Sequence, residues 1–131
     1  MHVLIVDDDP IVAESCRRIL TAEGIHPIVA GDAEKAVAIL ASGTPVDLMI
    51  TDIKMPKQDG FHLVARAKQV NGGIPVLIIT GYLTPETVQR GRQSGGDGFL
   101  AKPFTPSELV TAVYRTSLKP KEDKQKRGET R

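Results

Sequence analysis

The sequence has only one cysteine, no run of about 18 apolar residues and no basic leader at its amino terminus. Cys16 alone cannot form an internal disulfide, and its place in a predicted helix favours a reduced thiol in the core. Without a long apolar run, the chain has no candidate transmembrane helix. Because Met1 leads directly into an apolar, strand-like run, nothing predicts export, and we expect a cytoplasmic protein without membrane contact.

The net charge is also small, but it is divided unevenly along the chain. The formal charge of +1 combines a tail, residues 119–131, that has six basic and three acidic side chains with a body, residues 1–118, of charge −2. A nearly neutral body gives no electrostatic reason to expect direct nucleic-acid binding. The length suits one core, so we predict one domain over 1–118 and a disordered charged tail or linker over 119–131.

Apolar runs typical of strands alternate five times with helical patterns, which predicts an α/β fold with helices on both faces of a parallel sheet. Three runs are continuously apolar and should be central, because a strand covered on both faces has no polar side. The run with Pro27 and the short last run suit the sheet edges. The predicted strands are residues 2–6, 26–30, 47–51, 76–80 and 98–101.

Capping residues and glycines mark the predicted helix boundaries. Helices should begin where a capping side chain precedes a proline, at Asp9-Pro10, Thr84-Pro85 and Thr105-Pro106. Thr105 and Glu108 also form a predicted capping box. Helices should end at glycines in the left-handed conformation, at Gly24, Gly43, Gly72 and Gly95. The fourth helix has few apolar residues and an internal Gly91, which costs about 1 kcal/mol relative to alanine, so we expect it to be the loosest element.

Polar side chains follow or close four of the predicted strands. In an open parallel sheet, ligands bind beyond the carboxyl ends of the strands, so these side chains should lie together. If the first and third strands are neighbours, three carboxylates meet, and two of them about 4 Å apart repel by about 4 kcal/mol at an effective dielectric constant of about 20. A cation should lie between them, and hard oxygen ligands suit Mg²⁺. The candidates are Asp7, Asp8, Asp52, Thr80 and Lys102.

Each candidate has an ordinary structural explanation when it is taken alone. Asp9, beside the acidic pair, is expected to be a helix cap. Lys102 alone suits a solvated surface charge, and Thr80 alone suits a β-branched strand residue. Only their joint placement at successive strand ends indicates a functional site.

The chain resembles the receiver domains of two-component response regulators in four stretches: LIVDDDP at 4–10, DLMITDIKMPKQDG at 47–60, LIITGY at 77–82 and GFLAKPF at 98–104. The resemblance covers nearly all of residues 1–118. It implies a doubly wound, flavodoxin-like three-layer sandwich whose five parallel strands have the order 2-1-3-4-5.

The resemblance also implies a role for each candidate. Asp52 is implied to accept a phosphoryl group from the phosphohistidine of a sensor histidine kinase or a phosphotransfer protein. Asp7, Asp8, Asp52 and the backbone carbonyl of Lys54 are implied to hold Mg²⁺, and Lys102 to supply a second cation. Positive charge is needed because an anionic carboxylate must approach an anionic phosphoryl group.

Thr80 and Phe99 are implied to form the switch. The Thr80 hydroxyl would donate to the phosphoryl group, and Phe99 would turn inward, which changes the surface of the fourth helix, fifth strand and fifth helix. Family members often have tyrosine where Phe99 stands, and Phe99 is alternatively a simple core residue of an edge strand. The Lys102-Pro103 peptide bond is expected to be cis. Lys54 and Tyr82 flank the acceptor, so we expect them to hinder the water that hydrolyses the phosphoaspartate.

On this interpretation the protein is a signalling switch rather than an enzyme with a separate substrate. It acts on a downstream target or an attached output domain, and a homodimer on activation is compatible with the resemblance. Two alternatives stay open. One is a haloacid-dehalogenase-like magnesium-dependent phosphatase that uses Asp7 and Asp9, and the other is a receiver-fold binding module that is never phosphorylated.

Overall fold

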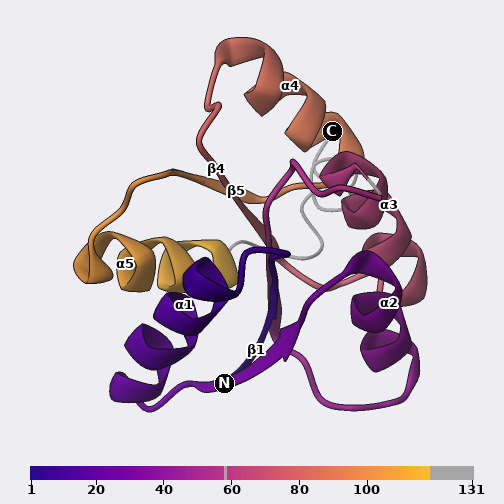
Figure 1. Ribbon diagram of the computed structural model, residues 1–131. Helices are drawn as coiled ribbons and strands as arrows, with labels where there is room; N and C mark the ends of the chain where they lie inside the picture. The colour runs from indigo at the N-terminus through magenta and orange to yellow at the C-terminus, as the bar shows by residue number, and fades with distance from the viewer. Residues whose placement is uncertain (58, 119–131) are drawn as a thin grey trace, which may run out of the picture.

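Five strands alternate with five helices in the part of the chain that the computed structural model describes, residues 1–57 and 59–118 (Figure 1). The strands are β1 (His2–Val6), β2 (His26–Ala30), β3 (Leu48–Thr51), β4 (Val76–Thr80) and β5 (Gly98–Ala101). The helices are α1 (Pro10–Ala22), α2 (Ala33–Ala41), α3 (Gly60–Val70), α4 (Pro85–Ser94) and α5 (Pro106–Ser117). The predicted tail, residues 119–131, lies outside the described residues.

The strands form one parallel sheet in the order β2-β1-β3-β4-β5. This confirms the α/β class, the implied strand order and the edge positions of β2 and β5. β3 begins one residue later than predicted, at Leu48. Asp47 precedes the strand, and its carboxylate accepts a hydrogen bond from the His2 N–H at 2.7 Å. Since β1 and β3 are neighbours, the residues that follow them emerge side by side.

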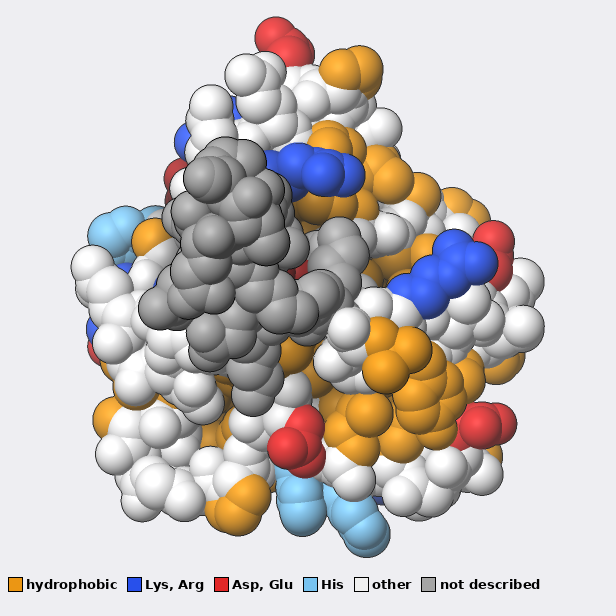
Figure 2. Space-filling view, turned by 180° about the vertical axis from the view of Figure 1, so that it is seen from behind, with side chains coloured by type: hydrophobic (Ala, Val, Ile, Leu, Met, Phe, Trp, Pro, Cys, Tyr) orange, Lys and Arg blue, Asp and Glu red, His pale blue; other side chains and the backbone are white. Residues whose placement is uncertain are grey.

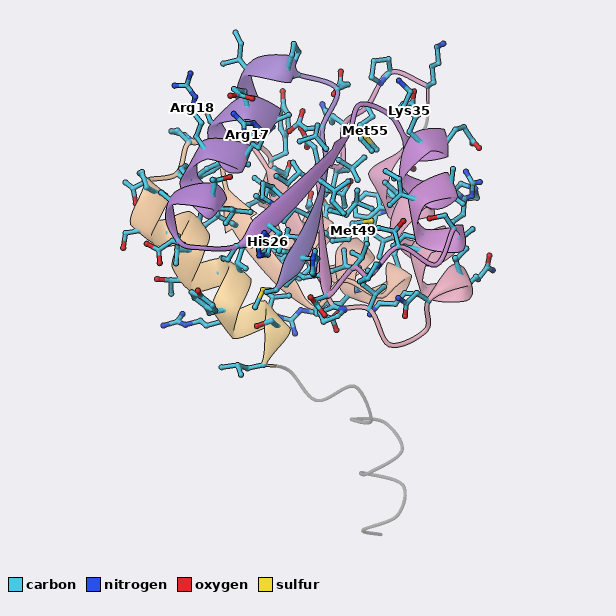
Figure 3. The ribbon with its side chains drawn as sticks, turned by 90° about the horizontal axis from the view of Figure 1, so that it is seen from below. Arg17, Arg18, His26, Lys35, Met49 and Met55 are labelled. Carbon is cyan, nitrogen blue, oxygen red and sulfur yellow. The ribbon has the colours of Figure 1, made fainter. Side chains whose placement is uncertain are left out.

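Helices cover both faces of the sheet, which gives three layers (Figure 1). Successive residues of a strand point to opposite faces. In β1, Val3 and Ile5 therefore pack with α1 and α5, whereas Leu4 and Val6 pack with α2 and α3. Met49 of β3 belongs to the second of these cores, and Figure 3 shows it among the side chains between the sheet and the helices. Two apolar cores thus hold the central strands in place.

The predicted helix starts are confirmed. The side chains of Asp9, Thr84 and Thr105 cap α1, α4 and α5, and Thr105 with Glu108 forms the capping box. The glycine ends are confirmed at three positions, with positive φ angles at Gly24, Gly43 and Gly95. At Gly72 the predicted helix stop is confirmed, but the predicted left-handed conformation is wrong. α3 ends at Val70, its C-cap Asn71 has an extended backbone, and no left-handed turn is needed there.

α4 is attached to the molecule by little apolar surface, and Gly91 is its one buried residue. A Cβ at Gly91 would lie 2.5 Å from Cε1 of Phe99 and 2.9 Å from Cδ1 of Ile78. The glycine that is unfavourable for the isolated helix therefore makes room for the Phe99 ring in the folded protein.

The start of α3 is pressed against the backbone that follows β3. A Cβ at Gly60 would overlap the carbonyl oxygen of Asp52 and lie 2.5 Å from Cα of Ile53. The Gly60 N–H also donates to the carbonyl of Ile53 at 2.8 Å. Because both neighbours are backbone, neither can move aside independently.

We predict that Gly60→Ala destabilises the protein by about 1–3 kcal/mol or more, since overpacking against backbone leaves no room for relaxation. Gly31→Ala is the matched control, because no atom lies within 4 Å of a Cβ at that position. The control should change the free energy of unfolding by no more than about 0.5 kcal/mol. Urea denaturation measures both values, and equal stabilities of the two variants would contradict the close contact at Gly60.

Candidate functional site

The predicted site residues lie at the carboxyl end of the sheet. Asp7 follows β1, Asp52 follows β3, Thr80 closes β4 and Lys102 follows β5. The main chain fixes this arrangement in two places, because the Asp52 N–H donates to the carbonyl of Val6 and the Lys102 N–H donates to the carbonyl of Thr80. The strand order therefore brings together residues that are up to 95 positions apart.

Lys102 connects two of the predicted carboxylates. Its Nζ donates to Oδ2 of Asp52 at 2.8 Å and lies 3.3 Å from Oδ2 of Asp7. The side chains of Lys102, Asp52 and Asp7 are 22%, 12% and 7% exposed, so this ion cluster is largely shielded from solvent. Charges in such a place interact more strongly than they do at a surface, because solvent screens them less.

Burial and the neighbouring charges shift the pKa values of this cluster in opposite directions. Burial raises the pKa of Asp7, whereas the Asp9 N–H and Lys102 act to lower it and the charge of Asp52 raises it further. Burial acts to lower the pKa of Lys102, but its hydrogen bond with Asp52 and the two nearby carboxylate charges outweigh burial, so that the pKa is raised. The ammonium form of Lys102 is thus held in place, and the carboxylate of Asp7 is costly to keep charged.

The Asp52 carboxylate has a fixed orientation. Its Oδ1 accepts hydrogen bonds from the N–H groups of Ile53, at 2.6 Å, and Lys54, at 3.3 Å. Its Oδ2 accepts from Lys102 at 2.8 Å. Donors on both oxygens hold the group at the end of β3, and it remains partly accessible. This geometry suits an anionic nucleophile that must meet another anion.

Asp8 is exposed at the surface, whereas Asp7 is buried. Asp8 lines two surface depressions, one with Lys54 and Asp59 and the other with Asp32 and Lys57. Among the described residues, no group of three His, Cys, Asp or Glu side chains is arranged to hold a metal ion. Of the three predicted carboxylates, those of Asp7 and Asp52 form ion pairs with Lys102.

This donor set still fits a magnesium ion. Magnesium is commonly held by one or two carboxylates and keeps several water molecules, so it does not require three protein side chains. Asp7 and Asp52 supply two hard oxygen donors within reach of the same ammonium group. A divalent cation beside Asp7 would also offset the cost of its buried charge.

Thr80 and Phe99, the predicted switch residues, lie next to the ion cluster and below α4 respectively. Thr80 is 1% exposed, and its Oγ1 accepts a hydrogen bond from the Tyr82 N–H at 3.0 Å. Phe99 is half-buried, packs on the α2 and α3 side of the sheet and touches Gly91. The ring thus packs beneath α4, a position that agrees with both explanations of Phe99.

Lys54 and Tyr82 come from different loops and meet above the sheet. Nζ of Lys54 lies 3.8 Å from the centre of the Tyr82 ring, which is a cation–π contact. The Lys102-Pro103 peptide bond is cis, as expected. The sequence analysis did not predict another cation–π contact, in which Arg90 of α4 lies over the Phe61 ring of α3, because residues 29 positions apart on separate helices share no local signal.

Comparison with known proteins agrees with this geometry. A profile of the response regulator receiver domain family matches residues 3–114. The chain is 35% identical over 120 residues to an uncharacterized 14.6 kDa protein in the sodA1 3′ region of Leptolyngbya boryana, and the match covers 90% of this chain and 91% of that protein.

Longer regulators match as well. The chain is 35% identical over 122 residues to the DNA-binding response regulator MtrA of Mycolicibacterium smegmatis, with 93% of this chain and 52% of MtrA covered. It is 38% identical over 116 residues to the transcriptional regulatory protein AruR of Pseudomonas aeruginosa, with 84% of this chain and 46% of AruR covered. The chain thus spans about half the length of these two regulators.

Solved structures show the same fold. The chemotaxis protein CheY4 of Vibrio cholerae superposes with a TM-score of 0.83 and 31% identity, covering 88% of this chain and 97% of that one. A CheY-like receiver domain protein from Methanospirillum hungatei gives a TM-score of 0.82 and 28% identity, covering 97% of both chains.

The chain therefore belongs to the response regulator receiver domain family, whose members are phosphorylation-activated switches of two-component signalling. Its role is in signal transduction. Within the residues that the structure describes, none of the helices combines the length and the apolar composition needed to cross a bilayer.

We predict that Asp7→Asn becomes more stable relative to the parent as the pH rises. The folded-state pKa of Asp7 is raised above its ordinary value of 3.8, so the folded state binds more protons between the two pKa values. The free energy of unfolding of the parent should therefore decrease as the pH rises through this window. The variant has no carboxylate at position 7 and should not show this decrease. Urea denaturation of both proteins from pH 3.5 upward, roughly from the ordinary pKa of aspartate, measures the difference.

Asp8→Asn is the control for general charge effects, because Asp8 is the adjacent carboxylate and is exposed. A difference between Asp7→Asn and the parent that stays constant or shrinks with rising pH would contradict the burial of the Asp7 charge.

Proposed function

We propose that Asp52 accepts a phosphoryl group from the phosphohistidine of a sensor histidine kinase or a phosphotransfer protein. The observation that carries this proposal is the pairing of Asp52 Oδ2 with Lys102 Nζ at 2.8 Å, in a cluster shared with Asp7. A carboxylate that is shielded, oriented and paired with a cation has the properties that in-line attack on phosphorus requires.

Each side chain of the site has a separate role in this reaction. Asp52 attacks the phosphorus with one carboxylate oxygen, and the phosphorus–nitrogen bond to the histidine breaks as the new phosphorus–oxygen bond forms. The Ile53 and Lys54 N–H groups hold the other oxygen. Lys102, which pairs with Asp52 beforehand, then pairs with a phosphoryl oxygen. A magnesium ion held by Asp7, Asp8, Asp52 and the Lys54 carbonyl would supply positive charge for the incoming phosphoryl oxygens.

The chain acts on itself rather than on a separate substrate. It promotes only its own phosphorylation and dephosphorylation, so we classify it as a switch and not as an enzyme. The working unit is residues 1–118, and residues 119–131 form a charged tail or a linker. The proposal includes a cytoplasmic location, where a sensor kinase presents its phosphohistidine.

The switch runs from Thr80 toward Phe99. A phosphoryl group on Asp52 adds about −1.5 to −2 charge and strong acceptor oxygens, and the Thr80 hydroxyl is one donor for them. A shift of Thr80 changes the space available to Phe99 and so the surface of α4, β5 and α5. Because Phe99 has no hydroxyl, its inward position gains no hydrogen bond, and the coupling rests on packing alone.

This surface would control a downstream target or an attached output domain. MtrA is a DNA-binding regulator of which the chain covers 52%, which supports an attached output domain in proteins of that arrangement. The body, residues 1–118, has a formal charge of −2, so we expect no direct nucleic-acid binding by this domain. A homodimer through α4 and α5 on activation is part of the proposal.

We predict that Asp52→Asn abolishes phosphorylation, since an amide is not a nucleophile toward phosphorus. Incubation with a small phosphodonor and Mg²⁺, followed by intact mass measurement and peptide mapping, should place one phosphoryl group on Asp52 of the parent. Asp9→Asn is the control, because Asp9 caps α1 through its Oδ1 and asparagine keeps that cap.

The same experiment separates the alternatives. A phosphoryl group on Asp7 would favour the haloacid-dehalogenase-like phosphatase, in which Asp7 is the nucleophile. A parent protein that gains no phosphoryl group from donor and Mg²⁺ would favour the binding module and end the present proposal.

We predict that the Lys54→Asn, Tyr82→Ala double variant loses its phosphoryl group faster than the parent. The contact of the Lys54 ammonium with the Tyr82 ring joins two loops that flank Asp52, and water must pass them to reach the phosphorus. The decay of the phosphorylated mass after removal of the donor measures the lifetime. Lys57→Asn, an exposed lysine in the same loop, is the control, and equal lifetimes of double variant and parent would contradict the barrier.

A further inference from the structure

Two basic side chains of α4 lie over aromatic rings of other elements. Gly91 is the one buried residue of α4, so the helix lacks the apolar stripe that normally fixes a surface helix. Arg92 lies over the Phe99 ring with 5.7 Å between guanidinium carbon and ring centre, and Arg90 lies over the Phe61 ring at 4.3 Å. Figure 2, which views the molecule from behind, shows a basic side chain lying across hydrophobic ones in the upper part, where α4 is.

The two arginines reach different partners. Arg92 contacts β5 at Phe99, the predicted switch residue. Arg90 reaches the first turn of α3 instead, where Phe61 is buried and the exposed carboxylate of Asp59 lies 3.8 Å from the Arg90 guanidinium. Asp59 is the N-cap of α3, and its other oxygen accepts from the Phe61 N–H at 2.7 Å. Arg90 therefore contacts both the cap and the first apolar residue of α3.

This first turn of α3 is in direct contact with the phosphorylation site. Gly60 lies between Asp59 and Phe61, and its Cα packs so closely on the Asp52 carbonyl and Ile53 that a Cβ would overlap them. Packed backbones have discrete arrangements and do not deform continuously. A displacement of the Asp52 main chain would therefore move Gly60, and with it the two groups that Arg90 touches.

From these contacts we infer that Arg90 is a positioning residue that couples α4 to the phosphorylation site through Asp59, Gly60 and Phe61, by a route that uses neither Thr80 nor Phe99. The inference rests on the proposed phosphorylation of Asp52. It deepens that proposal, because it supplies a second connection to α4 in a chain whose Phe99 has no hydroxyl. Since coupling is reciprocal, a partner that fixes α4 through this contact also alters phosphorylation of Asp52.

The test is amide hydrogen exchange of the α4 peptide in the full chain, with and without a small phosphodonor and Mg²⁺. Intact mass measured in parallel gives the phosphorylated fraction of each sample. Without donor, Arg90→Gln should raise the exchange rate of α4 about two- to five-fold, the factor that corresponds to an exposed cation–π contact. Arg90→Lys keeps the cation and should restore most of the protection, which the loss of an unrelated helix contact would not explain.

The coupling between Arg90 and the phosphorylation site is measured in the Thr80→Val variant, which lacks the Thr80 hydroxyl. Phosphorylation should still change the exchange of α4 in Thr80→Val, and this remaining change should vanish in Thr80→Val, Arg90→Gln. Thr80→Val, Arg92→Gln is the matched control, because it removes the same charge from the same helix, and it should keep the remaining change.

Two results would overturn the inference. One is that Thr80→Val alone removes the whole response of α4 to phosphorylation, and the other is that Thr80→Val, Arg90→Gln responds as strongly as Thr80→Val. In both cases the mass spectrum shows phosphorylated Asp52, so the proposed function stands. If the parent gains no phosphoryl group, the proposed function fails and the coupling fails with it.

Discussion

The site depends on the ammonium group of Lys102, which lies between the carboxylates of Asp7 and Asp52. Burial favours the protonated form of a carboxylate, and it raises the pKa of Asp7. Removing one partner from a buried ion pair typically costs about 3–5 kcal/mol, since a charge is left uncompensated. Loss of Lys102 would therefore leave the carboxylates of Asp7 and Asp52 without their shared cation, and its ammonium group holds Oδ2 of Asp52 at 2.8 Å.

The strand order of the sheet brings the residues of this cluster together. β5 is an edge strand, and β4 separates it from β3. The Lys102 N–H is fixed to the Thr80 carbonyl at the end of β4, and from there the long side chain reaches Asp52. Asp7 emerges from β1 on the other side of β3. A different strand order would leave each of these residues as an isolated charge at a strand end.

Two glycines allow the close contacts that surround the site. Gly60 brings α3 against the backbone of Asp52, and Gly91 brings α4 against Phe99. Their value is invisible in local propensity, which counts each glycine only as a weak helix former. The reverse holds for Gly72, where composition predicted a left-handed helix end and the chain instead leaves α3 through an extended Asn71. Glycine marks a position where the backbone has freedom, and the neighbouring elements decide whether that freedom is used.

The sequence by itself determined the element types, the helix caps and the strand ends that carry Asp7, Asp52, Thr80 and Lys102, because these depend on side chains a few residues apart. Only the tertiary structure decided which carboxylates share Lys102, that Asp8 stays exposed, and that Arg90 of α4 lies over Phe61 of α3. These contacts join residues far apart in the chain. Their distances depend on how whole strands and helices pack, and no local pattern encodes that.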